Sequence, residues 1–269
     1  MREAIAALAG ARLRLELSAR GAVLRRASHG WQRRLETIGE IAWDEDPSLD
    51  AARFVERCAP LFAPLRCAGW PLAVGLGATQ ARLFMVTPPH NVARLGDLRA
   101  AAAQRLHGLY GDDEAGWQLA FDGGVDGAFL ASATPHARLA ALRALAAAHR
   151  LHLASVASRF VAAWNAARPR LAGDWLAVDD DGLLALATRA AAAPRRLLGV
   201  HLLRLPAAWP DPAWLREQVG RVALREGLAV PDRLRVVRAG EAEGTVLELS
   251  RLHPVDRPAV PMAEREALG

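Results

Sequence analysis

The sequence contains no lysine, so all 34 of its basic side chains are arginines. This absence excludes several enzyme classes in their usual form, because P-loop nucleotide-binding proteins, protein kinases and Schiff-base enzymes each need a lysine at the reacting group. Cysteine is scarce too, and two residues, Cys58 and Cys67, cannot build a disulfide-rich secreted scaffold. They also lack the second pair that a zinc site would use, so we expect both to be small apolar packing residues.

Long uninterrupted apolar segments are also missing. The most apolar stretch, 139–164, is broken by Arg143, Arg150 and Arg159. A helix that crosses a bilayer needs about 20 apolar residues in a row. We therefore expect no direct membrane insertion and a cytoplasmic location, with any membrane association made through partner proteins.

The composition is that of a folded globular protein. Of 269 residues, 52% are hydrophobic and 23% are charged, which excludes intrinsic disorder as a description of the whole chain. The net charge is +5, and the densest basic cluster is Arg25, Arg26, Arg33 and Arg34. Such a cluster could bind nucleic acid. We prefer to interpret it as a solvated strand edge, because the arginines elsewhere are scattered among acids, and we expect no nucleic-acid partner.

The hydrophobic pattern predicts two related α/β lobes with mixed sheets. Polar and apolar residues alternate over 12–17, which indicates a half-buried strand, and Ser48 or Asp50 could cap the first helix. The remaining pattern predicts strands at 21–24, 37–43, 71–76, 82–86, 117–121, 127–133, 151–156, 174–178, 183–187, 197–205, 233–237 and 246–249, and helices at 96–108, 135–149, 158–168 and 212–226.

Two short motifs have both a functional and a plain structural interpretation. The segment Gly75–Gln80 resembles the start of a dinucleotide-binding fingerprint, but it lacks the third glycine and precedes a predicted strand, so we expect a tight turn. The acidic run Asp179–Gly182 could hold a divalent metal, but such a sequence more often forms a hairpin turn whose carboxylates face solvent. We expect the second of these and no metal site.

The order of elements resembles that of the PilM family of actin-like pilus assembly proteins and of the related cytoplasmic domain of the type II secretion L protein. The resemblance is carried by Pro88-Pro89 after a strand, by the strand Trp117–Asp122 with its acidic end, and by the strand Phe129–Ala133 before an alanine-rich helix. It covers roughly 12–249, by pattern and order. It implies an α/β, two-lobed actin-like (ribonuclease-H-like) fold with an inserted small α+β subdomain.

The resemblance also implies three nucleotide-binding turns, and these are degenerate in this sequence. In the first phosphate turn, Glu16 and Ser18 replace an aspartate and a glycine, so a bound anion would meet a carboxylate. The adenosine turn keeps one glycine, Gly240, of the usual pair. We therefore expect a pseudo-ATPase without catalytic residues and without a bound cofactor.

The second phosphate turn is the most altered. It keeps Asp179 and Gly182 of the family pattern, but Asp180 and Asp181 stand between them. Three carboxylates repel phosphate unless a metal bridges them. Under the alternative hypothesis of an active ATPase or phosphotransferase, Asp179 or Asp181 would hold the magnesium ion of ATP.

The family further implies a scaffold that binds the cytoplasmic tail of a bitopic inner-membrane protein and links it to an assembly ATPase or platform protein. We place the first lobe at 1–70 and 134–170, the inserted subdomain at 71–133, a second, reduced lobe at 171–253 and a loose tail at 254–269. The insert and its cleft with the first lobe would be the docking place. Arg82, Phe84 and Val86 are the candidate strand edge for the tail, unless they simply pack the insert.

Overall fold

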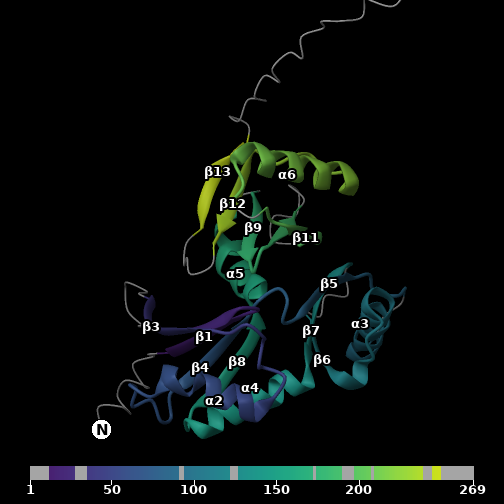
Figure 1. The fold of residues 1–269 in the computed structure, drawn as a ribbon. Coiled ribbons are helices and arrows are strands. Elements are labelled where there is room, and N and C mark those ends of the chain that lie inside the picture. The colour runs from purple at the N-terminus through teal and green to yellow at the C-terminus, as the bar shows by residue number, and fades with distance from the viewer. Residues whose placement is uncertain are drawn as a thin grey trace, which may run out of the picture.

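The computed structural model describes residues 12–27, 35–90, 94–121, 127–171, 174–189, 197–206, 209–238 and 244–249. Within these residues the strands form two five-stranded sheets and one three-stranded sheet. Figure 1 shows the two larger sheets one above the other and the smaller sheet at their side. No helix in this part of the chain is long and apolar enough to cross a membrane.

The first lobe is built on a sheet of strand order β3-β2-β1-β4-β8. Parallel pairing joins β1 to β4 and β4 to β8, whereas β2 is antiparallel to both β1 and β3. On β1 the alternate residues Leu13, Leu15 and Leu17 are fully buried, as the predicted strand requires. The five strands are β1 (Arg12–Ser18), β2 (Gly21–Ala27), β3 (Leu35–Ala42), β4 (Pro71–Leu76) and β8 (His152–Ser158).

Two helices, α2 (Ala51–Phe62) and α4 (His136–Ala148), cover one face of this sheet. The predicted cap of α2 is Asp50, whose Oδ1 accepts hydrogen bonds from the backbone N–H groups of Ala52 and Arg53. The apolar face of α2 packs on the strand leucines through Phe54 and Phe62. Burial of such side chains contributes about 1.5–3 kcal/mol each.

The inserted subdomain is a three-stranded antiparallel sheet, β5-β7-β6, with one helix packed on it. Its elements are β5 (Arg82–Val86), α3 (Leu95–Tyr110), the 3-10 turn η1 (Glu114–Gly116), β6 (Trp117–Phe121) and β7 (Phe129–Pro135). The prediction that the insert begins at residue 71 is wrong, because β4 lies between β1 and β8 in the first sheet. The helix predicted at 96–108 is also longer than expected, because Gly111, with φ of 71°, ends it rather than Gly108.

The second lobe repeats the arrangement of the first. Its sheet has the order β11-β10-β9-β12-β13, so the first strand of each lobe is central, and it pairs antiparallel with the next strand of the chain and parallel with a later one. The two expected related lobes are thus present. The elements are β9 (Trp175–Asp180), β10 (Leu183–Thr188), β11 (Gly199–Arg204), α6 (Pro212–Glu226), β12 (Arg233–Val237) and β13 (Thr245–Glu248).

The lobes are joined by α5 (Arg159–Ala167) and the turn η2 (Arg168–Arg170), which run from β8 to β9. Figure 1 shows α5 between the two larger sheets. Its Phe160 and Trp164 are buried in one cluster with Leu176 and Val178 of β9. Leu83 and Leu130 of the insert join the same cluster, so the insert packs against the second lobe as well as continuing from the first.

Candidate functional site

The turns that begin the two lobes meet at the lobe junction. The β1–β2 turn lies at Ala19 and Arg20, and the β9–β10 turn lies at Asp181 and Gly182. The backbone N–H of Ala19 donates a hydrogen bond of 3.1 Å to Oδ2 of Asp181, 162 residues away in sequence. Both turn residues have positive φ, 58° for Asp181 and 75° for Gly182, which a tight hairpin turn of this kind requires.

An arginine that the sequence analysis did not single out completes this junction. Arg159 is the first residue of α5, and its Nη2 lies 2.9 Å from Oδ1 of Asp181. The same nitrogen forms an ion pair with Asp180. The exposed fractions of the three side chains are only 11% for Arg159, 12% for Asp181 and 1% for Asp180. The expectation that these carboxylates face solvent is therefore wrong, because the second turn is inserted between the lobes.

Burial decides the protonation of this cluster. It raises the pKa of Asp180 to about 7, although Arg159 and the backbone N–H of Ala78 act in the opposite direction. For Arg159, burial alone would lower the pKa, but Asp180 and Asp181 raise it overall. The guanidinium therefore stays charged, and Asp180 titrates near neutral pH.

The predicted first phosphate turn contributes Glu16 and Ser18. Glu16 is 95% buried and forms ion pairs with Arg14 at 3.0 Å and with Arg25 at 2.7 Å. Ser18 stabilises the β1–β2 turn. Its hydroxyl donates a hydrogen bond to the Gly21 carbonyl at 3.0 Å and accepts one from the Arg20 N–H. The structure thus brings the predicted residues Glu16, Ser18 and Asp181 to one junction, where the first two have partners in their own lobe.

The turn after β4 lies against the same junction. The backbone N–H of Gly77 donates to the Leu17 carbonyl at 3.0 Å, and a Cβ atom at this position would collide with Oδ2 of Asp181. The Gln80 backbone N–H donates a hydrogen bond to the Gly77 carbonyl at 2.9 Å. The expected tight turn in place of a dinucleotide fingerprint is therefore confirmed, and its glycine is needed for the close approach of the second lobe.

A buried polar network holds these turns from behind. The Gln80 amide donates to the Ser18 carbonyl and to Asp46, both at 3.1 Å. Arg138 of α4 donates in turn to Asp46 at 2.8 Å and to Ser48 Oγ at 2.7 Å. Gln80 and Arg138 are exposed by only 2% and 6%. Sequence reasoning missed both residues, and a polar residue inside an apolar helical pattern, as Arg138 is in α4, is the signal that could have found one of them.

The other predicted residues of the second and third turns make none of the contacts described above between the lobes. Asp179 is half-buried and precedes Asp180 in β9, so it points to the opposite face of the strand. Gly182 is exposed at the tip of the turn, and Gly240 lies outside the described residues. Among the residues that the structure describes, no group of three or more histidine, cysteine or acidic side chains has an arrangement that could hold a metal ion.

Two of the three side chains on the predicted partner-binding edge are buried inside the insert. Phe84 and Val86 are 96% and 98% buried in the core between the insert sheet and α3, so their side chains pack the insert. β5 is nevertheless an edge strand of the insert sheet, and its docking of a tail stays a prediction. Period-two alternation places both on the face that α3 covers. Arg82 is exposed, and its guanidinium lies over the rings of Tyr110 and Trp117, 4.7 and 5.6 Å from their centroids.

The two arginines of the basic cluster that lie among the described residues pair with carboxylates of this chain. Arg25 is paired with Glu16, and Arg26 donates to Glu36 of the neighbouring strand. Arg33 and Arg34 lie outside the described residues. Arg25 and Arg26 both lie in β2, which has β1 and β3 on its two sides, so the expectation of a strand edge is wrong for them.

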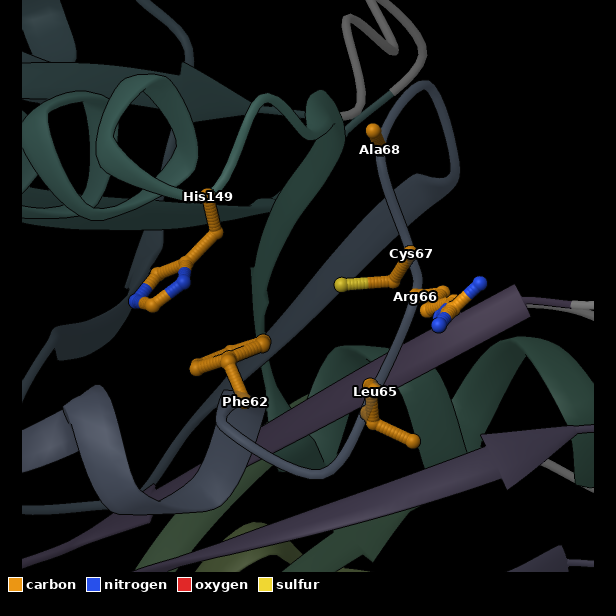
Figure 2. A pocket seen from close by; sticks show the side chains of 6 residues that line it. All are labelled: Phe62, Leu65, Arg66, Cys67, Ala68 and His149. Carbon is orange, nitrogen blue, oxygen red and sulfur yellow. The ribbon is translucent and has the colours of Figure 1, made fainter.

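A small hollow of about 360 Å³ lies at the carboxyl ends of α2 and α4 (Figure 2). The His149 ring stacks on Phe62 with centroids 4.5 Å apart, and burial lowers the pKa of this histidine. Both cysteines are buried as predicted, and burial raises the pKa of the Cys58 thiol to about 12, which leaves it unreactive. The hollow is lined by Phe62, Leu65, Arg66, Cys67, Ala68 and His149.

No family model matches the sequence, and no curated protein is detectably similar to it. Solved structures are similar. PilM in a PilM–PilN type IV pilus biogenesis complex superposes with a TM-score of 0.53 at 14% identity, over 81% of this chain and 66% of that chain. The present chain therefore spans just under two thirds of the length of that PilM chain.

Two further structures extend this likeness. The cytoplasmic domain of EpsL, an inner-membrane component of the type II secretion system of Vibrio cholerae, gives a TM-score of 0.53 at 14% identity over 85% of this chain and 82% of its own. A Bacteroides thetaiotaomicron protein of unknown function with an actin-like ATPase fold gives 0.54 at 8% identity, over 90% and 85%. The fold expected from the resemblance is thus confirmed: this chain has the actin-like fold that PilM and the EpsL cytoplasmic domain share.

Proposed function

We propose that this protein is a non-catalytic cytoplasmic scaffold of a type IV pilus or type II secretion assembly, and that it binds the cytoplasmic tail of a bitopic inner-membrane protein. The observation that carries the proposal is the hydrogen bond from the Ala19 N–H to the Asp181 carboxylate. This side chain fills the space between the two turns that would hold phosphate in an actin-like ATPase.

The groups around this space do not fit a nucleotide phosphate. The donors that could bind an anion, the Ala19 N–H and the Arg159 guanidinium, are both engaged by Asp181. Asp180 adds a second carboxylate at Arg159, and Glu16 is near enough to raise the Arg159 pKa as well. A phosphate would have to displace a tethered carboxylate and then lie beside the remaining ones, which Coulomb repulsion in a buried site opposes.

The tail-binding surface is proposed by analogy with a fold neighbour, since the PilM structure is a complex with PilN. We assign it to the region between the insert and β8. In the first sheet β8 has a neighbour on one side, β4, and its residues His152, Ala154 and Ser155 are exposed. An edge strand of small residues accepts an extended peptide by strand addition. In this scheme an assembly ATPase or platform protein would bind elsewhere on the scaffold.

Calorimetry tests the non-catalytic part of the proposal. Titration of ATP with magnesium into the wild-type protein should release no binding heat. A micromolar dissociation constant that is lost in Asp181→Ala, but kept in the exposed control Asp97→Ala, would overturn it and make the second turn a working nucleotide site.

A peptide titration tests the scaffold part. The probe is the synthetic cytoplasmic tail of a single-span inner-membrane protein that co-purifies with the tagged chain from detergent extracts. We expect micromolar binding by fluorescence anisotropy, and at least a tenfold loss when alternate peptide nitrogens of the tail are methylated, because strand addition needs those N–H donors. Equal binding of the methylated tail would contradict strand addition.

A further inference from the structure

The lobe junction carries more negative charge than it can neutralise. When all groups are ionised, Asp180 and Asp181 contribute two negative charges and Arg159 one positive charge. Glu16 also faces Arg159, but it is already paired with Arg14 and Arg25. Among the residues that the structure describes, the junction therefore holds one uncompensated negative charge in a site that is almost closed to water.

One proton on Asp180 would remove this excess. The groups that face its carboxyl are Arg159 from α5, Asp181 from its own turn and the backbone N–H of Ala78 from the turn after β4. Burial raises the pKa of this carboxyl to about 7, so both protonation states are populated near neutral pH. With the proton in place, Arg159 is matched by Asp181 alone.

The contacts that close the junction all involve the neighbouring Asp181. Its carboxylate binds the Ala19 N–H of the first lobe, and its Oδ2 lies against Gly77 of the same lobe. Arg159 holds the other oxygen of this carboxylate at 2.9 Å. A second negative charge on the same guanidinium competes directly with the group that spans the lobes.

We propose that Asp180 is a proton-linked switch of the lobe junction, which is closed when Asp180 is protonated and loosened when it is ionised. The switch requires no nucleotide and no partner protein, so it stands or falls separately from the proposed scaffold function. It would make the angle between the lobes respond to pH over the physiological range.

Hydrogen exchange measured by mass spectrometry on the full chain tests the switch. Protection factors, corrected for the intrinsic pH dependence of exchange, are compared at pH 6 and pH 8 for peptides that cover Ala19 and Gly77. We expect protection to fall by about tenfold at pH 8, because a carboxyl with a pKa of about 7 in the closed state and its ordinary value in the open state shifts the opening equilibrium by that factor between pH 6 and pH 8. The α2 and α6 helices should show no comparable change.

Two variants decide the assignment. Asp180→Asn imitates the protonated carboxyl and should show equal protection at both pH values, whereas Glu217→Gln, at an exposed ion pair of α6, should behave as the wild type does. Retained pH dependence in Asp180→Asn, or none in the wild type, would overturn the proposal. Should Asp180→Asn not fold, carbon-13 NMR of the wild-type carboxyl decides instead: a titration midpoint between 6 and 8 supports the switch, and one near 4 rejects it.

Discussion

The two lobes share a strand order but differ in how their central strands are covered. Counted back from the paired turns, Arg14 and Glu16 of β1 occupy the positions that Leu176 and Val178 occupy in β9. In β9 these two side chains are buried in the cluster around α5. In β1 they are charged and form an ion pair.

The linking helix explains this difference. The apolar face of α5 packs on β9, while its main contacts with the first sheet are at β4 and β8. The second sheet therefore has an apolar cover on both faces, from α5 and from α6, and the first sheet has one on the face of α2 and α4. A repeated topology thus does not require a repeated core: the single connecting helix serves one lobe, and the other lobe closes the same face with its own charges.

The largest effect that tests this comparison is expected when a charged residue of β1 and the matching apolar residue of β9 are each replaced by the other type. Leu176→Arg should destabilise the protein by more than about 4 kcal/mol, because it buries an unpaired charge under α5. The matched change Arg14→Leu should cost about 1 kcal/mol, because Arg25 still pairs with Glu16. Urea unfolding followed by tryptophan fluorescence measures both, and similar losses would show that the two faces are equivalent after all.

The next effect concerns the residue through which α5 joins the lobes. Arg159→Met should destabilise by about 3–5 kcal/mol at pH 8, because it leaves two buried carboxylates without their cation. The triple variant Arg159→Met, Asp180→Asn, Asp181→Asn should recover most of this loss. Thermal unfolding by circular dichroism provides the measurement. If the triple variant is as unstable as the single one, the packing of the arginine stem, rather than its charge, is what matters.

The smallest effect asks whether the lobes unfold as one unit. Asp50 caps α2 in the first lobe, and Asp211 caps α6 in the second by accepting from the Trp214 N–H at 2.7 Å. Replacing either by alanine should cost about 1 kcal/mol. Because α5 contacts both sheets and Asp181 accepts a hydrogen bond from Ala19 of the first lobe, we expect one urea transition that both variants shift to the same extent. Two transitions, each shifted by one variant, would show that the lobes unfold independently.

Local signals made most of the fold predictable. The alternation in β1, the caps Asp50 and Asp211 and the acidic hairpin between β9 and β10 each depend on residues within a few positions of one another, and each is present in the structure. The place of β4 was not predictable in this way, because a strand between two parallel neighbours is defined by its partners, β1 and β8, which are far away in sequence.

The site was harder to predict for the same reason. The acidic turn was expected in solvent because hairpin turns of this composition usually expose their carboxylates. Its partner Arg159 is 21 residues away from Asp180 in sequence and meets it through the fold. The alternation of side chains in β5 could be seen in the sequence, but the face of the insert sheet that α3 covers could not. Because α3 covers the face that carries Phe84 and Val86, these two side chains are buried.

The insert is attached to the first lobe by two chain segments, and it also touches the second lobe through Leu83 and Leu130. With α5 as the third connection, the three bodies form a closed triangle of supports. A pull applied to the insert would therefore load the first lobe through the two chain segments and the second lobe through the contacts of Leu83 and Leu130.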